Sequence, residues 1–313
     1  MVIVLKELSD YCLAWSKLDI SPTDLVLDVG SGHKPLARAN ILCDKFFCDD
    51  TERRGTLLVD RPVVVGDALF LPFKDRSIGY VYTSHMIEHI PDPERCLREL
   101  SRVARKGCVN APSKAWEKMA GGVPSHLWFV RVDTGKLVLE EKEEPIVDTV
   151  LKELALRMYA RDSYKPFYWR HRDLLEVAYE WKEEINYEIV RRSGERQGSN
   201  WIKSQELECS ATSEPVRRES IRQAVASLLG LGVRMLRSRA ALPRLVEILA
   251  CPFCLGHMEE VGAEAIACLK CKRKYPVRRG TPFMLRELAT SGRNYTIMPE
   301  NGRSAKTELM ESA

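Results

Sequence analysis

Residues 25–32, which read Leu-Val-Leu-Asp-Val-Gly-Ser-Gly, constrain the fold of this chain more than any other stretch. An apolar, partly β-branched run is interrupted at Asp28 and leads into a Gly-x-Gly turn, after which Pro35 opens an expected helix. A strand, a glycine turn and a helix in this order begin many nucleotide-binding α/β domains. Gly30 and Gly32 tolerate positive φ and let the backbone approach a ligand closely. The sequence therefore predicts a nucleotide site at this turn.

Short apolar runs recur along the following residues and alternate with polar or helical segments. Strands are expected at 25–29, 41–43, 63–65, 78–84 and 108–111. A helix is expected over 93–105, where apolar residues recur at helical spacing. Strands that alternate with crossovers predict an α/β fold with a parallel, doubly wound, Rossmann-like sheet.

The pattern loosens beyond residue 115. We expect a hairpin over 130–139 around an Asp-Thr-Gly turn, a helix over 146–160 and a strand at the end of 179–190. Further helices are expected over 1–20 and 221–236.

Three acidic residues at the ends of expected strands indicate what the turn binds. Asp28 precedes the glycine turn, Asp44 ends the second strand and Asp67 follows the third. The carboxyl ends of parallel strands share one edge of the sheet, where nucleotides bind. Carboxylates accept hydrogen bonds from ribose hydroxyls and from an adenine amino group. We therefore expect Asp44 to bind a ribose and Asp67 an adenine.

S-adenosylmethionine and a dinucleotide are the two candidate ligands. A dinucleotide fingerprint needs a third small residue after the second glycine, where this chain has Pro35, and its pyrophosphate needs helix-end N–H groups that proline lacks. The Asp28 carboxylate disfavours a phosphate and suits the cationic groups of S-adenosylmethionine. These points favour S-adenosylmethionine. An NAD-dependent oxidoreductase stays as an alternative, because Asp49 and Asp50 stand about where its ribose acid is expected.

Three motifs follow one another over about residues 20–115. They are Asp-Val-Gly-Ser-Gly at 28–32, Gly-Asp-Ala-Leu-Phe-Leu-Pro-Phe at 66–73, and a run at 80–89 that ends Ser-His-Met-Ile-Glu-His. In this order they resemble the class I S-adenosylmethionine-dependent methyltransferases of the small type 11 kind, from which Pro35 departs. The resemblance implies these cofactor-binding residues: Asp28, Gly30, Gly32, Asp44, Asp67, Ala68, Ser84 and His85.

Candidate catalytic residues follow the fourth expected strand. Methyl transfer is an in-line displacement at carbon, so holding the acceptor close to the sulfonium supplies much of the catalysis. A base is needed only when the acceptor must lose a proton. His85, Glu88 and His89 lie at the expected catalytic edge, and a histidine titrates near neutrality. One of them removes that proton, or Glu88 and His89 support the loop. His126 and Trp128 lie over the pocket mouth or in a packed aromatic loop.

Ten cysteines are present, and four of them form two C-x2-C pairs near the C-terminus. Cys251, Cys254, Cys268 and Cys271 give the spacing C-x2-C-x13-C-x2-C, which closes a tetrahedral zinc site with four thiolates. Four protein ligands leave no open position, so the zinc is expected to be structural. The other six cysteines are scattered, which favours reduced thiols in the cytoplasm over a disulfide framework.

The residues around these cysteines narrow the module further. Residues 245–252 and 275–285 resemble the multifunctional methyltransferase-subunit family, whose members are small zinc-ribbon activators. Known members bind and activate methyltransferases that act on tRNA, rRNA or translation factors. The resemblance implies a fused activator that stabilises its own catalytic domain by covering an apolar sheet edge.

These observations divide the chain into parts. We expect a methyltransferase domain over 1–200, a linker with a basic amphipathic helix over 201–241, the zinc ribbon over 242–285 and a disordered tail over 286–313. The first residues lack a long apolar segment followed by a cleavage site, so a cytoplasmic protein without a signal peptide is expected.

Partners are less constrained than the cofactor. The formal net charge of +4 is too small to indicate nucleic acid by itself. Six arginines over 217–239 either contact RNA phosphates or an anionic membrane, or lie on a solvated linker helix, which we favour. The methyl acceptor stays open between RNA, a translation protein, and a small molecule, sugar or lipid, and the oligomeric state stays open too. A catalytically silent scaffold subunit is the alternative from another functional class.

Overall fold

The computed structural model describes residues 18–48, 55–120, 122–142, 148–161, 164–192 and 242–290. The expected helix over 221–236 lies outside the described residues, and so do the whole linker over 201–241 and most of the first expected helix. No helix among the described residues is long and apolar enough to cross a membrane.

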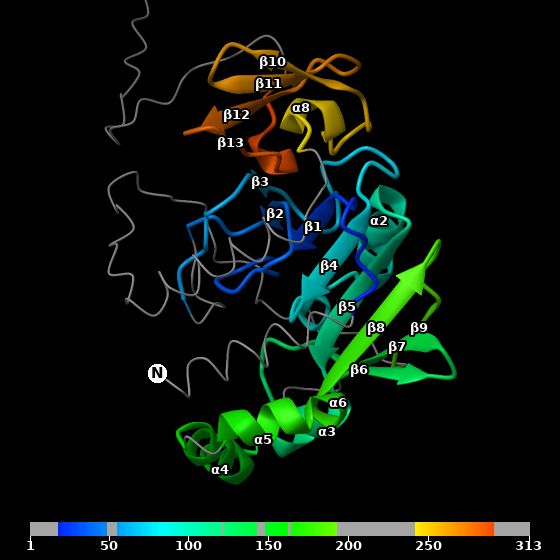
Figure 1. Cartoon of the computed structure of the whole chain (residues 1–313), viewed down its shortest axis with the longest axis vertical. Coiled ribbons are helices and arrows are strands. Elements are labelled where there is room, and N and C mark those ends of the chain that lie inside the picture. Colours follow the sequence, from blue (N-terminus) through cyan, green and yellow to red (C-terminus); the bar gives the residue numbers. More distant parts are fainter. Residues whose placement is uncertain are drawn as a thin grey trace, which may run out of the picture.

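The central sheet has six strands in the order β3-β2-β1-β4-β5-β8 (Figure 1). The first five are parallel, as expected, and the Rossmann-like prediction is confirmed. Their bounds are β1 Val26–Val29, β2 Ile41–Asp44, β3 Val63–Val65, β4 Tyr80–Ser84 and β5 Lys106–Pro112. All but the ends of these strands are buried, which explains their continuous apolar runs.

The sheet is mixed, because β8 (Glu176–Lys182) pairs antiparallel with β5. Its side chains alternate between buried and exposed, as expected for an edge strand with one face in solvent. The strand expected at the end of 179–190 is confirmed as β9 (Tyr187–Val190), but β8 was missed, although Val177, Tyr179 and Trp181 alternate with Ala178, Glu180 and Lys182.

The helix expected after Pro35 is the clearest error of the sequence-based prediction. Residues 31–40 form turns instead, and β2 begins directly after them. So short a connection cannot hold a helix together with its turns, and Lys34 is pushed out of the helical region by the proline that follows it. The segment is fixed from outside, since Arg61 Nη1 donates to the carbonyl oxygens of Leu36 and Ala39 at 3.0 Å each.

Helix α2 (Pro93–Val103) covers one face of the sheet and ends two residues earlier than predicted. Asp92 caps it by accepting from the N–H of Arg95 at 3.0 Å, and proline occupies its first turn. Its buried residues are Pro93, Cys96, Leu97, Leu100 and Val103.

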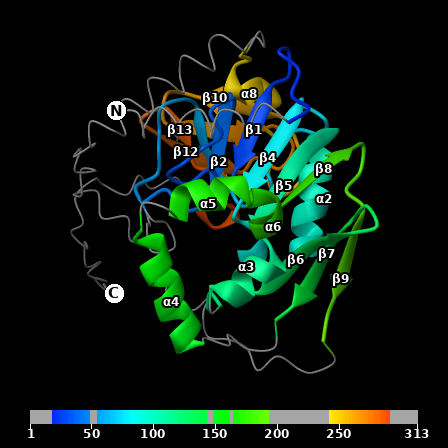
Figure 2. The same cartoon turned by 60° about the horizontal axis from the view of Figure 1, so that its bottom comes forward.

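A small second sheet joins β6 (Trp128–Asp133), β7 (Lys136–Glu141) and β9 (Tyr187–Val190). The predicted hairpin is confirmed, with Thr134 and Gly135 at φ of 45° and 78° in its two-residue turn. The short helices η1 (Ile87–His89), α3 (Lys114–Met119), α4 (Thr149–Tyr159), α5 (Tyr164–Arg170) and α6 (Arg172–Leu175) complete the domain. Figure 1 shows α3 to α6 together at the bottom of the molecule, and Figure 2 shows the same group from the front.

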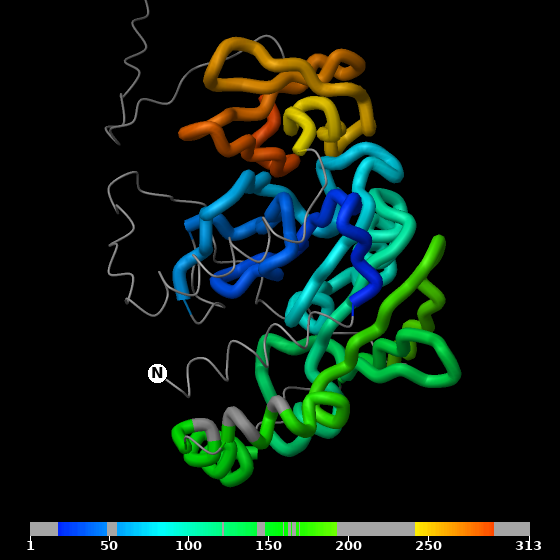
Figure 3. Tube along the Cα trace, in the orientation of Figure 1, coloured from blue at the N-terminus to red at the C-terminus, as the bar shows by residue number. Residues whose placement is uncertain are grey.

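The C-terminal module, orange at the top of Figure 3, is an antiparallel four-stranded sheet with one short α-helix. Its elements are α8 Leu245–Ile248, β10 Met258–Val261, β11 Ala265–Cys268, β12 Lys274–Arg278, β13 Thr281–Pro282 and the 3-10 turn η3 Arg286–Leu288. The first residues of the expected tail are therefore ordered, and Thr290 exchanges two backbone hydrogen bonds with Lys274 at 3.0 Å.

The module lies directly on the edge of the central sheet. Phe283 pairs with Val65 of β3 in parallel fashion, and the N–H of Met284 donates to the carbonyl oxygen of Val65 at 2.7 Å. A second contact joins Leu249 to Phe73 in antiparallel fashion. One continuous hydrophobic core contains residues of both the sheet and the module. The edge of the sheet at β3 is therefore covered by the chain's own C-terminal part.

The scattered cysteines behave differently from one another. Cys43, Cys96 and Cys108 are free and buried, in keeping with the expected reduced thiols. Cys48 is disulfide-bonded, so that expectation is wrong at this position. Cys12 and Cys209 lie outside the described residues.

Candidate functional site

The glycine turn is folded back onto the end of β2. Gly30 and Gly32 have φ of 72° and 53°, which only glycine adopts without strain. The N–H of Gly30 donates to the carbonyl oxygen of Cys43 at 2.8 Å, and the N–H of Gly32 to Asp44 Oδ2 at 2.9 Å. A Cβ on Gly30 would lie 2.8 Å from Met86 Sδ, so the close packing here also requires glycine.

Asp28 is buried beneath this turn. Its Oδ2 accepts from the N–H of Leu36 at 2.6 Å, which helps to hold the segment that replaces the expected helix. Burial raises the pKa of Asp28 to about 7, although the Leu36 hydrogen bond and the charge of Arg61 act in the opposite direction. A cation placed near Asp28 would favour the ionised form and lower this pKa again.

Asp44 and Asp67 stand at the carboxyl ends of β2 and β3, as the sequence predicts. Asp44 Oδ1 accepts from the N–H of Phe46 at 3.0 Å, in addition to the bond with Gly32. Asp67 pairs with Lys45 Nζ at 2.8 Å and accepts from the N–H of Leu69 at 2.9 Å. Both carboxylates therefore accept hydrogen bonds within their own loops. Ala68 is buried as part of the hydrophobic core.

The turn has the properties that a small cationic nucleotide derivative requires. Ser31 Oγ is buried and has no hydrogen-bond partner among the described residues, so a polar group is left for a ligand. The Asp44 carboxylate gives the turn a negative charge, and a cation bound beside Asp28 would add that of a second carboxylate. Residues 31–40 supply no helix N-terminus for a pyrophosphate. The residues fit S-adenosylmethionine and disfavour a dinucleotide.

Ser84 and His85 lie at the carboxyl end of β4, where Ser84 is in register with Asn110 of β5. His85 has a φ of 52°, and its N–H donates to the carbonyl oxygen of Asn110 at 3.0 Å. Its Nδ1 is 3.6 Å from Glu88 Oε1 and its Nε2 is 3.6 Å from Glu176 Oε1. Desolvation opposes the charge, but these two carboxylates raise the pKa of His85 to about 9. The imidazole is thus protonated at neutral pH, and a general base must first lose that proton.

Glu176, the first residue of β8, is a site residue that the sequence did not indicate. Its carboxylate accepts from Asn110 Nδ2 at 3.0 Å, from Arg172 Nε at 2.5 Å and from the hydroxyl of Tyr168. Burial opposes its charge, but His85, Arg172 and Tyr168 lower its pKa to about 2. A local sequence pattern does not indicate this cluster, because its residues come from β5, α5, α6, β8 and the position directly after β4.

The structure brings Glu88 and His89 of η1 next to His126. The rings of His89 and His126 meet edge-on, with centroids 4.5 Å apart. His126 Nδ1 is hydrogen-bonded to Glu117, whose other oxygen pairs with Lys142 Nζ at 2.6 Å.

Trp128 does not line a pocket mouth. It is buried, and its indole N–H donates to the carbonyl oxygen of Ile90 at 2.7 Å. The expectation of a packed side chain is therefore correct for this residue, but Trp128 begins strand β6 and does not lie in a loop.

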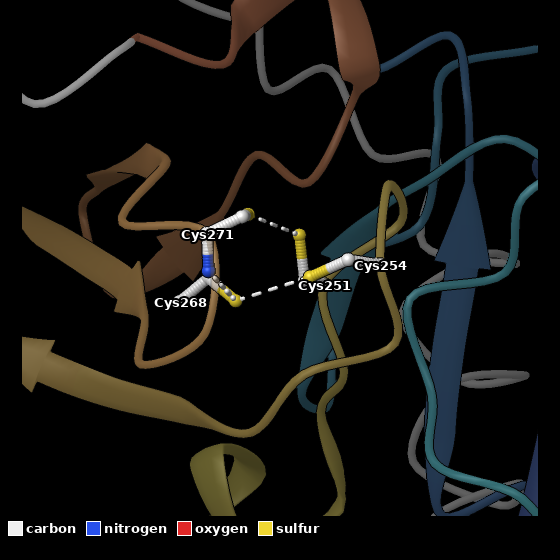
Figure 4. A group of neighbouring side chains, drawn as sticks. All are labelled: Cys251, Cys254, Cys268 and Cys271. Carbon is white, nitrogen blue, oxygen red and sulfur yellow. Dashed lines mark hydrogen bonds between the residues drawn. The ribbon is translucent and has the colours of Figure 1, made fainter.

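The four module cysteines converge at one point (Figure 4). Their sulfurs all lie within 4.8 Å of one another, with Cys251 and Cys271 3.6 Å apart and Cys254 and Cys268 3.5 Å apart. The N–H of Cys271 points at Cys268 Sγ at 3.4 Å, and the hydroxyl of Tyr275 is 3.3 Å from Cys251 Sγ. Four free thiols in this arrangement match a tetrahedral metal site.

Two family models match the chain in agreement with this architecture. Residues 27–110 match the methyltransferase domain model, and residues 243–280 match the model of Trm112p-like proteins. The chain combines a methyltransferase domain with a Trm112p-like domain. Both resemblances expected from the sequence are thus confirmed, and the methyltransferase family implies S-adenosylmethionine as the cofactor.

The curated relatives match only part of the chain. A demethylmenaquinone methyltransferase of Corynebacterium efficiens is 34% identical over 99 residues, which are 29% of this chain and 41% of that protein. The norajmaline N-methyltransferase of Rauvolfia serpentina is 51% identical over 43 residues, which are 14% of this chain and 15% of that protein. The chain therefore spans about two fifths of the first relative and far less of the second.

The similar solved structures are more distant in sequence. A complex of the Haloferax volcanii Trm112 methyltransferase activator is 16% identical, covers 55% of this chain and 88% of that chain, and has a TM-score of 0.32. The PH0226 protein of Pyrococcus horikoshii is 14% identical, covers 55% of this chain and 86% of that chain, and has a TM-score of 0.31.

Proposed function

We propose that the protein transfers a methyl group from S-adenosylmethionine to an acceptor. The observation that carries this proposal is the glycine turn at the carboxyl edge of the sheet, which Asp44 holds through the Gly32 N–H and beneath which Asp28 is buried. Its negative charge complements the sulfonium and ammonium groups of the cofactor. The family match over the same residues supports the same cofactor.

The side chains at this edge take distinct roles in the proposal. Asp28 attracts the cationic methionine part, Asp44 accepts from the ribose, and Asp67 and Ala68 form the adenine side of the site. S-adenosylmethionine supplies the electrophilic methyl group. His85 is held between two carboxylates at the end of β4. It orients the acceptor or, once the imidazole has lost its own proton, accepts the proton of the acceptor.

The four cysteines hold a structural zinc ion in this proposal. All four positions of a tetrahedral zinc are then filled by thiolates, which leaves none for a substrate. The metal stabilises the module, and the module in turn covers the β3 edge of the methyltransferase domain. The Trm112p-like domain thereby acts on its own chain.

Isothermal titration with S-adenosylmethionine tests the cofactor. We expect one binding event per chain, weakened at least tenfold in Asp44→Ala, which removes the acceptor for the Gly32 N–H. Asp133→Asn, an exposed substitution in the β6–β7 turn, is the matched control and should bind normally. Binding heat with NAD but not with S-adenosylmethionine would support the oxidoreductase. No binding heat with either ligand would support the scaffold.

The acceptor is identified by incorporation of labelled methyl groups into fractionated cell extract. RNA, protein and lipid are counted separately, together with the small-molecule pool. Signal in one fraction, lost in the Asp44→Ala variant, assigns the acceptor class. Equal counts with and without the protein would contradict methyl transfer.

A further inference from the structure

A second set of ligand-type side chains lies beside the candidate cofactor site. Glu88 and His89 come from η1, directly after β4, and His126 comes from the loop that precedes β6. One potential ligand atom of each residue lies within 4.8 Å of those of the other two. This set is separate from the four cysteines, which belong to the C-terminal module.

Both imidazoles are oriented by hydrogen bonds through Nδ1. His89 Nδ1 is 3.1 Å from the carbonyl oxygen of Ser125, and His126 Nδ1 is bonded to the Glu117 carboxylate. Lys142 Nζ holds Glu117 in turn at 2.6 Å. Metal-binding histidines donate one ring N–H to a carbonyl or carboxylate in this way, which fixes the tautomer with its lone pair on the other nitrogen. With both Nδ1 atoms donating, the lone pair would lie on Nε2 in each residue.

Glu88 adds a buried carboxylate to the set. Its side chain is 1% exposed, and neither of its oxygens has a hydrogen-bond partner among the described residues. The half-exposed His85 ring, 3.6 Å away, supplies a counter-charge but no hydrogen bond. A buried carboxylate without donors is costly to hold, and a cation bound directly to its oxygens removes that cost.

We propose that Glu88, His89 and His126 bind a first-row divalent transition-metal ion. Two imidazoles and one carboxylate suit manganese, iron, cobalt or zinc, whereas calcium and magnesium prefer oxygen ligands alone. Three protein ligands leave coordination positions open. The ion therefore differs in kind from the closed, all-thiolate site of the module.

The position of this site gives the ion a role at the carboxyl edge of the sheet. Glu88 also contacts His85, which lies at the end of β4 where the acceptor binds in the proposed function. A divalent ion with open positions orients and polarises an oxygen ligand. That role rests on the proposed methyl transfer, whereas metal binding itself does not.

The site is tested by titrating the full chain, with the cysteine site loaded with zinc, against Mn²⁺ and separately Co²⁺. Free Mn²⁺ is followed by electron paramagnetic resonance and Co²⁺ by its absorption spectrum. We expect one additional ion per chain. Glu88→Gln and His126→Asn should each weaken binding at least tenfold, and Glu117→Gln should weaken it by about tenfold because it removes the partner of His126.

His171→Asn is the matched control, since His171 contacts Phe167 and lies outside the cluster. It should leave metal affinity unchanged, and circular dichroism should show that all variants are folded. The proposal is overturned if neither ion binds, or if the cluster variants bind as tightly as the parent chain. S-adenosylmethionine binding is measured in parallel, so a chain that binds the metal but not the cofactor would refute methyl transfer alone.

Discussion

Single residues at the glycine turn place a buried charge where a cationic ligand is expected. Asp28 is buried and has a pKa of about 7, well above that of a carboxyl group in water. The ionised form is therefore disfavoured until a cation binds beside it. Such a carboxylate destabilises the empty site and strengthens its selectivity for positive charge.

The raised pKa of Asp28 makes cofactor affinity depend on pH. About one tenth of the carboxyl groups are ionised one pH unit below the pKa and about nine tenths one unit above it. We therefore expect the Kd for S-adenosylmethionine to fall by about tenfold between pH 6 and pH 8, as measured by isothermal titration. Asp28→Asn keeps an acceptor for the Leu36 N–H but should abolish this dependence. An unchanged pH profile in Asp28→Asn would assign the titration to another group.

Ionisation of Asp28 should lower the folding stability of the ligand-free protein as pH rises, whereas it strengthens cofactor binding. The folded pKa lies above the unfolded value, so the folded chain binds the proton more tightly. Its contribution to stability is complete below pH 4 and is lost as pH rises towards 7. Asp28→Asn should therefore raise the melting temperature of the ligand-free protein at pH 8, measured by scanning calorimetry. A lower melting temperature would contradict the burial argument.

Gly30 is restricted both by its backbone and by its neighbour. Gly30→Ala introduces a Cβ at positive φ and 2.8 Å from Met86 Sδ. Gly135→Ala has a similar φ of 78° but meets nothing within 4 Å, so it isolates the backbone effect. We expect Gly30→Ala to lower the free energy of unfolding by about 1–3 kcal/mol more than Gly135→Ala. Urea denaturation measures the free energy of unfolding of both variants. Equal losses would show that the Met86 side chain moves aside without a cost in free energy.

At the scale of elements, sequence patterns identified strands and the hairpin better than helices near the site. The apolar runs of β1 to β5 are continuous because both faces are buried, so they stand out locally. The helix after Pro35 failed because strand β2 begins too soon after the glycine turn. The alternation in β8 fits a half-exposed edge strand. The strand was missed because so short a run also competes with helical signals.

The contact of β3 with Phe283 should supply much of the free energy that attaches the module to the methyltransferase domain. Phe283 is buried, packs on Phe47 with ring centroids 5.2 Å apart, and pairs with Val65. Phe283→Ala should lower the free energy of unfolding by about 3 kcal/mol because it leaves a cavity in this interface. Val261→Ala, on the exposed strand β10, should change it by less than about 0.5 kcal/mol. Denaturant unfolding compares the two, and similar losses would contradict a tight interface.

At the scale of the whole molecule, the two domains share one hydrophobic core. Residues from β1 and from the module belong to the same buried cluster. Arg286 reinforces the junction, since its guanidinium lies 4.2 Å from the ring centroids of both Phe70 and Phe253. We therefore expect the module to unfold together with the methyltransferase domain.

Removal of zinc should therefore destabilise the entire chain. We expect one zinc per chain by elemental analysis, none in Cys268→Ser and the full amount in Cys108→Ala, a buried cysteine outside the cluster. A chelator should lower the melting temperature of the main calorimetric transition, because loss of the module exposes the β3 edge. A transition that stays at the same temperature after zinc loss would show that the domains fold independently.

The sequence alone determined the strand and glycine turn, the order of the acidic residues and the spacing of the cysteines. These are local features, set by the chemistry of residues a few positions apart. The tertiary structure decided what lies around them: Glu176 against His85, His126 against His89, and Phe283 against β3. Such contacts join residues that are distant along the chain. They depend on how the sheet edge, η1 and the module pack together, which no periodicity of the sequence expresses.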